Sequence, residues 1–160
     1  MGRKQKIYFD RSLSLIVSIK NITVLGSGIM GHGIAQVSAM AGYKVVLRDI
    51  EQKFLDKAMD KIKWSLQKLA EKNRISKEEV DIFYNNITPL VNLQTAIEKA
   101  DLIIEAVPED YDLKKKVYQE LNSLAEKNII FASNTSTLPI TELSKLTDRP
   151  DKFIGVHFFN

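Results

Sequence analysis

A histidine and a serine near the carboxyl end of the chain offer the clearest chemistry. His157 lies in the segment GVHFFN, and Ser136 lies in the segment SNTS. An imidazole titrates near neutral pH, so His157 could accept the hydroxyl proton of a secondary alcohol as hydride leaves the carbon. Ser136 could hydrogen-bond the substrate oxygen, and Asn160 could hold the nicotinamide side of a cofactor or order the site. The alternative for His157 is a structural side chain that is bonded to backbone.

A glycine motif near the amino end predicts a site for a dinucleotide. Gly26, Gly28 and Gly31 form G-x-G-x-x-G where a short β-branched run meets a helical pattern. The first glycine allows a tight turn, the second lets the backbone approach a pyrophosphate, and the third allows close packing of helix on strand. Free N–H groups and the helix dipole then attract the phosphates. We include Ile29 and Met30, between the second and third glycines, among the cofactor-binding residues.

An acidic residue follows this motif at the expected distance. Asp49 ends the next predicted strand, 18 positions after Gly31. A carboxylate there can accept both hydroxyls of the adenosine ribose and would repel the 2′-phosphate of NADP, so the sequence predicts NAD. The alternative is an exposed aspartate at the end of a strand, which is common in sheets that bind nothing.

An alternation of strands and helices must position these residues. The apolar and β-branched runs predict strands at 19–25, 43–49, 87–91, 101–107, 129–133 and 153–159, with helices between them that include 51–72 and 112–127, one ending near 100 and one after 139. Ser76 and Glu79 form a capping box for a short helix, which makes an inserted helical hairpin with 51–72. Right-handed crossovers favour a doubly wound Rossmann sheet of the α/β class, mainly parallel, in the order 3-2-1-4-5-6.

Polar residues gather where several of these strands end. They are Glu105 and Glu109 after the fourth strand, Ser133, Asn134, Thr135 and Ser136 after the fifth, and His157 and Asn160 in or after the sixth. Ligands of open α/β sheets bind outside the carboxyl ends of the strands, so we expect these residues to converge.

Composition excludes several classes of function. The 23 basic and 20 acidic side chains give a net charge of only +3, which does not argue for nucleic acid or a membrane surface. The chain has no cysteine and only two histidines, so we expect no disulfide and no metal site. No apolar run is long enough to span a membrane and no signal peptide is evident, which predicts a cytoplasmic protein. We expect one domain at 19–160, preceded by an arm at 1–18 that is disordered or extraneous.

Four blocks of sequence, taken together, resemble the N-terminal NAD-binding domain of the 3-hydroxyacyl-CoA dehydrogenases. The blocks are GSGIMGHGIAQVSAMAGYKVVLRD, DLIIEAVPED, ASNTSTLPIT and GVHFFN. The resemblance implies NAD-dependent oxidation of (S)-3-hydroxyacyl-CoA to 3-oxoacyl-CoA, in fatty acid beta-oxidation or hydroxybutyryl-CoA metabolism. It implies that the NAD site is lined by Asp49, Ala106, Glu109, Lys114, Ser136 and Asn160. It also implies catalysis by His157 and Ser136, and binding of the acyl-CoA substrate by Ser65, Lys72 and Ser136.

The chain departs from the family pattern in one respect. The family pairs its catalytic histidine with a glutamate about a dozen residues further on, and it adds a C-terminal helical domain that closes the acyl pocket and forms a homodimer. This chain ends at Asn160, before both. We therefore expect NAD binding with little or no turnover by this chain alone, and possible self-association through an exposed apolar face. Two alternatives stay open: a non-catalytic NAD-binding module, and a dehydrogenase of free hydroxy acids.

Overall fold

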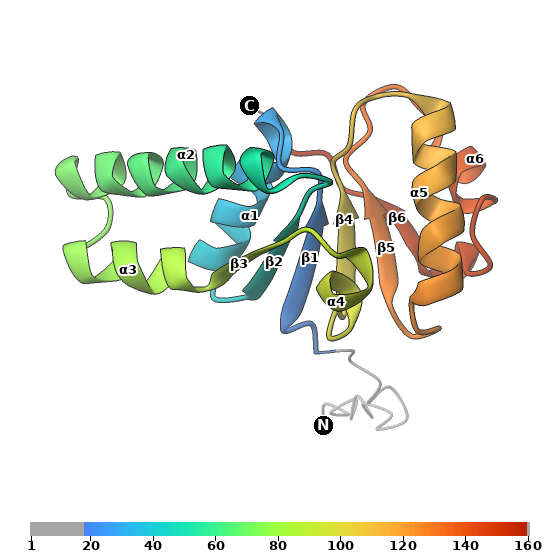
Figure 1. The fold of residues 1–160 in the computed structure, drawn as a ribbon, viewed down its shortest axis with the longest axis horizontal. Helices are drawn as coiled ribbons and strands as arrows, with labels where there is room; N and C mark the ends of the chain where they lie inside the picture. Colours follow the sequence, from blue (N-terminus) through green and yellow to red (C-terminus); the bar gives the residue numbers. More distant parts are fainter. Residues whose placement is uncertain (1–17, 160) are drawn as a thin grey trace, which may run out of the picture.

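The computed structural model describes residues 18–159, which form a single sheet with helices on both faces (Figure 1). The predicted arm and Asn160 lie outside these residues, apart from Ser18. In chain order the elements are β1 (Asn21–Leu25), α1 (Ile29–Met40), β2 (Lys44–Arg48), α2 (Gln52–Glu71), α3 (Lys77–Asn85), β3 (Ile87–Leu90), α4 (Leu93–Ile97), β4 (Leu102–Glu105), α5 (Tyr111–Leu124), β5 (Ile130–Ser133), α6 (Ile140–Ser144), a 3-10 turn (Pro150–Lys152) and β6 (Phe153–Gly155).

The sheet has the predicted topology. Its strand order is β3-β2-β1-β4-β5-β6, and every strand pairing is parallel. The order reverses at β1, so the connections after β1 and after β4 leave the sheet in opposite directions and open a crevice at the carboxyl ends of these strands. The Rossmann prediction is confirmed.

Both faces of the sheet are buried, which explains the nearly continuous apolar strands. Successive residues of β4 face opposite sides: Ile104 packs in the core that contains α1 and α2, and Ile103 packs in the core that contains α5 and α6. Phe131 and Ala132 of β5 alternate in the same way. Side chains that alternate in a strand require a cover on each face, and Figure 1 shows these helices on the two sides of the sheet.

The inserted hairpin of α2 and α3 is also confirmed. The two helices pack on each other and extend away from the sheet, at the left of Figure 1. At the start of α3, Ser76 Oγ accepts from Glu79 N, and the Glu79 carboxylate accepts from Ser76 N at 2.7 Å. Leu55, Ile62 and Leu66 of α2 are fully buried, as their spacing predicts.

Several elements are shorter than predicted. The prediction of a strand through residue 159 is wrong beyond Gly155, so His157 follows β6 instead of lying within it. The physical reason is a side chain: Asn134 Oδ1 accepts a hydrogen bond from Phe158 N at 2.8 Å, so this amide does not continue the backbone pairing of β6 with β5. Similarly, β4 ends at Glu105, whose own carboxylate accepts from Val107 N at 2.9 Å.

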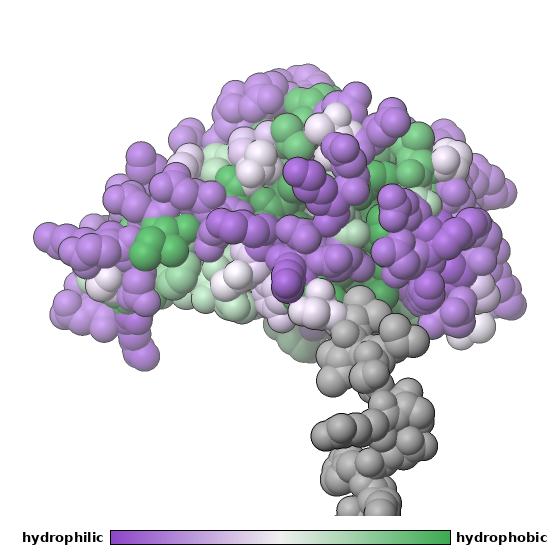
Figure 2. Space-filling model, turned by 90° about the horizontal axis from the view of Figure 1, so that it is seen from below, coloured by the Kyte–Doolittle hydropathy of each residue, from purple (hydrophilic) through white to green (hydrophobic). Residues whose placement is uncertain are grey.

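The surface of the described residues shows no membrane segment. No helix within residues 18–159 is both long and apolar enough to cross a bilayer. Figure 2 shows the edge at the amino ends of the strands, where hydrophilic residues predominate. The cavity described below lies at the opposite edge.

Candidate functional site

The glycine motif forms a tight turn between β1 and α1. Gly26 has φ +93°, and a Cβ there would lie 2.7 Å from Ala106 O. A Cβ on Gly31 would lie 1.7 Å from Gly26 O, whereas one on Gly28 would meet no atom within 4 Å. The first and third glycines are therefore required by the protein's own packing. The second leaves open space, which agrees with the steric roles predicted for the three positions.

A cavity of about 730 Å³ lies against this turn, at the carboxyl ends of the central strands. Its wall contains Gly26, Ser27, Gly28, Ile29, Met30, Arg48, Asp49, Ile50, Phe54, Lys57, Ala58, Lys61, Ala106, Val107, Pro108, Glu109, Leu113, Val117, Asn134 and Ser136. The first-turn amides of α1 have no partner within the helix, and no acidic side chain occupies that turn. Backbone donors beside an apolar cavity of this size suit a dinucleotide.

Asp49 lies on the cavity wall, but its carboxylate is already engaged. Asp49 Oδ2 accepts from Ser27 N and from Ser27 Oγ, each at 2.7 Å, and Oδ1 accepts from Ile50 N at 2.7 Å. These bonds fix the carboxylate against the glycine turn and leave further lone pairs for a ribose. Sequence reasoning missed Ser27. Its position between the first two glycines could have indicated its role, because a small hydroxyl side chain there can reach Asp49 at the end of β2.

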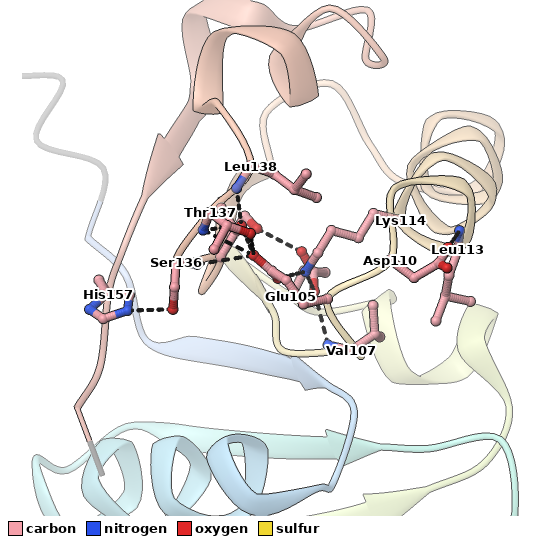
Figure 3. A network of polar contacts seen from close by, with 12 residues as sticks. Glu105, Val107, Asp110, Leu113, Lys114, Ser136, Thr137, Leu138 and His157 are labelled. Atoms are coloured by element: carbon pink, nitrogen blue, oxygen red, sulfur yellow. Dashed lines mark hydrogen bonds and ion pairs between the residues drawn. The ribbon is translucent and has the colours of Figure 1, made fainter.

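A buried carboxylate, Glu105, ends β4, and four donors surround it, of which Figure 3 shows Lys114 and Val107. Glu105 is fully buried; its Oε1 accepts from Lys114 Nζ at 2.7 Å and from Val107 N at 2.9 Å. Its Oε2 accepts from Ser133 Oγ at 2.7 Å and from Tyr118 OH at 3.1 Å. Burial, reinforced by the negative charge of Glu105, raises the pKa of Tyr118, so this hydroxyl stays a donor. Within residues 18–159 every buried polar side-chain atom has a partner.

A second carboxylate organises the turn after β5. Glu109 Oε1 accepts from Thr137 Oγ1 at 2.9 Å, from the amides of Ser136 and Thr137 at 3.1 Å each, and from Thr135 Oγ1. Its Oε2 lies 3.2 Å from Lys114 Nζ. Partial burial raises the pKa of Glu109, but the bonds from Thr135, Thr137 and Lys114 outweigh it and lower the pKa to about 2. Glu109 therefore holds this turn as an anion.

The turn presents Ser136 to His157. Ser136 Oγ and His157 Nε2 are 2.8 Å apart and hydrogen-bonded, and both side chains are exposed (Figure 3). The ring of Phe159 packs edge-on against the imidazole, with centroids 4.5 Å apart. A hydroxyl bonded to an imidazole can place a substrate oxygen within reach of a proton acceptor. The structure thus brings together the two residues that the sequence nominated for chemistry.

Comparison with known proteins decides the family. The family model described as "3-hydroxyacyl-CoA dehydrogenase, NAD binding domain" matches residues 21–160. The chain belongs to this family. This match confirms both the family resemblance and the NAD cofactor that the sequence predicted.

Relatives of this 3-hydroxyacyl-CoA dehydrogenase domain occur in animals and bacteria. The mitochondrial hydroxyacyl-coenzyme A dehydrogenase of Rattus norvegicus is 38% identical over 149 residues, which cover 90% of this chain and 48% of that enzyme. A probable 3-hydroxybutyryl-CoA dehydrogenase of Bacillus subtilis is 39% identical over 144 residues, covering 90% and 50%. The chain spans about half the length of these relatives.

Solved structures of the family share this fold. The (S)-3-hydroxybutyryl-CoA dehydrogenase of Ralstonia eutropha superposes with a TM-score of 0.86 at 36% identity, covering 89% of this chain and 50% of that one. The 3-hydroxybutyryl-CoA dehydrogenase of Escherichia coli gives 0.85 at 31%, covering 89% and 30%. A prephenate dehydrogenase of A. aeolicus, at 14% identity and a TM-score of 0.57, shares the fold alone.

Some residues that the resemblance implied lie away from the cavity of this dehydrogenase domain. Lys114 is buried behind the wall, where two carboxylates engage its ammonium. Ser65 is half-buried and Lys72 is exposed, further along α2 than Lys57 and Lys61, which do line the cavity. Sequence reasoning also missed Tyr118, a hydroxyl donor to Glu105. It placed Ser133, the other hydroxyl donor, only among the polar residues expected to converge.

Proposed function

We propose that this chain is the cofactor half of an NAD-dependent dehydrogenase that oxidises (S)-3-hydroxyacyl-CoA to 3-oxoacyl-CoA. The hydrogen-bonded Ser136–His157 pair carries the proposal, because it lies at the carboxyl edge of the sheet beside a cavity that suits a dinucleotide. NAD supplies the hydride acceptor when it is bound. The activity, acyl-CoA substrate and fatty acid metabolism of the whole protein belong to this proposal, since the chain spans about half of its relatives.

The chain's own residues have distinct proposed roles around the cavity. The glycine turn and the first amides of α1, including Ile29, Met30 and Gly31, receive the pyrophosphate. Asp49 accepts the hydroxyls of the adenosine ribose, and Ala106 and Glu109 face the cofactor from the end of β4. We further propose that Asn160, which lies outside the described residues, contacts the nicotinamide side.

His157 and Ser136 would act on the substrate oxygen. His157 Nε2 takes the hydroxyl proton as the C–H bond gives up its hydride, and Ser136 Oγ holds the same oxygen in place. The carbonyl forms as both hydrogens leave, one as a proton to imidazole and one as hydride. On α2, Ser65 and Lys72 would receive the coenzyme A portion of the substrate, as the family resemblance implies.

One observation favours a non-catalytic role for the chain by itself. Within residues 18–159 no carboxylate bonds His157, so the imidazole lacks a partner that would orient it and support its charge. Exposed Ile154 and Phe159 near β6 also leave self-association as a prediction. A cytoplasmic location likewise stays a prediction, since the relatives include mitochondrial and bacterial proteins.

Binding and turnover together test the proposal. Calorimetry should detect NADH uptake by this chain, and NAD reduction with (S)-3-hydroxybutyryl-CoA should appear only when the chain is extended past Asn160 with the second half of a relative.

In that longer form His157→Ala should lower turnover by about 100-fold or more with little change in NADH affinity. Ser136→Ala should also lower turnover, whereas Ser123→Ala on the exposed face of α5 should not. Absence of NADH binding, or equal turnover of His157→Ala, would refute the corresponding role. Turnover of a free hydroxy acid in place of the CoA ester would favour the other dehydrogenase class.

A further inference from the structure

The buried ion pair between Glu105 and Lys114 has no evident use in packing alone. Both side chains are at most 1% exposed, and Nζ and Oε1 are 2.7 Å apart. Two ions removed from water are costly, and apolar side chains of similar volume often stabilise a core equally well. A pair of this kind therefore raises the question of what else it holds in place.

The contacts of the pair continue toward the surface. Besides Glu105, Lys114 Nζ reaches Glu109 Oε2 at 3.2 Å. The other oxygen of Glu109 accepts hydrogen bonds from the hydroxyls of Thr135 and Thr137 and from the amides of Ser136 and Thr137. These donors form the turn that carries Ser136. Figure 3 shows the sequence of contacts from Glu105 and Lys114 through the turn to His157. Each step is a direct hydrogen bond or ion pair.

The buried end of this series is the rigid one. Lysine has a long flexible stem, and an ammonium on it takes a single position only when its donors are engaged. Glu105 is fixed by Tyr118 and Ser133 from two other elements, and it holds Lys114 Nζ in turn. Glu109, by contrast, has a side chain that is 37% exposed and would sample other rotamers without a fixed cation beside it.

We infer that the buried Glu105–Lys114 pair is a positioning unit for Ser136: it fixes Glu109, and Glu109 gathers the turn that presents Ser136 Oγ to His157. Lys114 and Glu105 are positioning residues, since neither touches the cavity. The consequence for turnover rests on the proposed function, whereas the positioning of Ser136 does not. It can therefore be measured on this chain without cofactor or substrate.

The test compares a variant that removes both buried charges with the unmodified chain. Glu105→Gln combined with Lys114→Met keeps the side-chain volumes and leaves no buried ion unpaired, so the fold should persist. By NMR, the cross-peak between Ser136 Hβ and the His157 ring should weaken or vanish. The acid midpoint of the Ser136 and Thr137 amide shifts should rise, because Glu109 loses its cation. An unchanged cross-peak together with an unchanged midpoint would overturn the inference.

A second variant breaks the series at its exposed end. Glu109→Gln preserves shape, removes the charge and leaves the buried pair intact, so it should weaken the same cross-peak without loss of fold. Thr88→Val, an exposed β-branched exchange on β3, is the control and should change neither signal. A cross-peak of full strength in Glu109→Gln would show that the turn needs no carboxylate and would also overturn the inference. If the variants lose the cross-peak but the unmodified chain fails to bind NADH, the positioning unit would be supported and the proposed function refuted.

Discussion

On the β1–β2 side of the cavity close backbone contacts shape the glycine turn, whereas on the β4–β5 side the wall is held in place by side chains. Gly26 and Gly31 shape the first region because no larger residue fits against the neighbouring carbonyls. In the second region Glu105 and Glu109 together accept eight hydrogen bonds from side chains and amides, apart from the second contact of Lys114. The first region can bind a phosphate through its own amides, and the second must be assembled before it can place Ser136.

The difference lies in how far apart along the chain the partners are. The glycine motif spans six residues, so its geometry is mostly local, apart from the close approach of Ala106 O to Gly26. Apart from the Val107 amide, the donors to Glu105 and Glu109 lie 9, 13, 26, 27 or 28 positions away from them. A local turn tolerates change elsewhere in the sheet, but a network of this kind depends on the correct packing of β4, β5 and α5 together. The second region should therefore be the one in which changes of charge affect stability most.

The largest effect is expected for Lys114→Met alone. It leaves Glu105 buried with no cation, and breaking a buried pair in this way costs about 3 to 5 kcal/mol of unfolding free energy. Adding Glu105→Gln should restore most of that loss, because the uncompensated charge is then gone. Urea denaturation of the single and double variants measures both. If the single variant proved as stable as the unmodified chain, the stability of the side-chain region would not depend on the Glu105–Lys114 ion pair.

Gly31→Ala tests the backbone region and should affect binding. Its Cβ would collide with Gly26 O, so the turn must shift and its amides move away from the pyrophosphate. Each bond to a charged group is worth about 1.5 to 3 kcal/mol, so NADH affinity should fall by about 10- to 100-fold. Gly33→Ala is the matched control, because a Cβ there meets nothing within 4 Å. The Gly33→Ala variant should bind NADH normally and, because alanine favours a helix over glycine, gain up to about 1 kcal/mol of stability. Calorimetry of both variants decides, and equal affinities would contradict the steric role of Gly31.

The sequence predicted the backbone region well because its signals are local. Strand order, hairpin and glycine turn follow from periodicity, capping residues and steric limits that lie within a few positions of each other. The capping box at Ser76 and the stripe of Leu55, Ile62 and Leu66 appear in the structure where the pattern placed them. The extent of β6 was missed because a side chain from another strand, Asn134, ends it.

The side-chain region was only partly predictable. The sequence placed Glu105, Glu109 and Ser136 near one another, but it did not distinguish the buried acid from the one on the cavity wall. The family resemblance singled out Lys114 for the NAD site, but the sequence did not predict that it alone of three consecutive lysines is buried, while Lys115 and Lys116 are exposed. A signal was available, since Lys114 shares a helical stripe with Tyr118 and Leu121, the other buried residues of α5.

A smaller effect is expected for Asp49→Asn, where the backbone region relies on one side chain. Asparagine keeps an acceptor oxygen and loses only the charge, so the loss should lie at the lower end of the range for charge-assisted bonds, about 1.5 kcal/mol, and NADH should bind about tenfold more weakly. Discrimination against NADPH should narrow at the same time, because the carboxylate no longer repels its phosphate. Ser27→Ala, which removes one hydroxyl bond to Asp49 but keeps both amide bonds and the charge, should have a milder effect on NADH and preserve the discrimination. Parallel titrations with NADH and NADPH measure these differences. Undiminished discrimination in Asp49→Asn would assign it to another residue.

The smallest effect concerns Glu109 in acid, and it returns to the side-chain region. Its pKa in the folded chain is about 2, below the ordinary value of 4.5, so the unfolded chain takes up the proton first as the pH falls. Glu109 therefore contributes stability that is complete above about pH 4.5 and is lost as the pH falls through that value toward 2. Glu109→Gln should lack this part of the acid dependence, so its stability should fall less steeply in that window, while other carboxylates such as Asp101 still titrate. Thermal unfolding of both chains from pH 5 to pH 2 measures the difference. Parallel curves would mean that the bonds from the 135–137 turn do not favour the ionised carboxylate, and the link between Lys114 and Ser136 would then rest on shape alone.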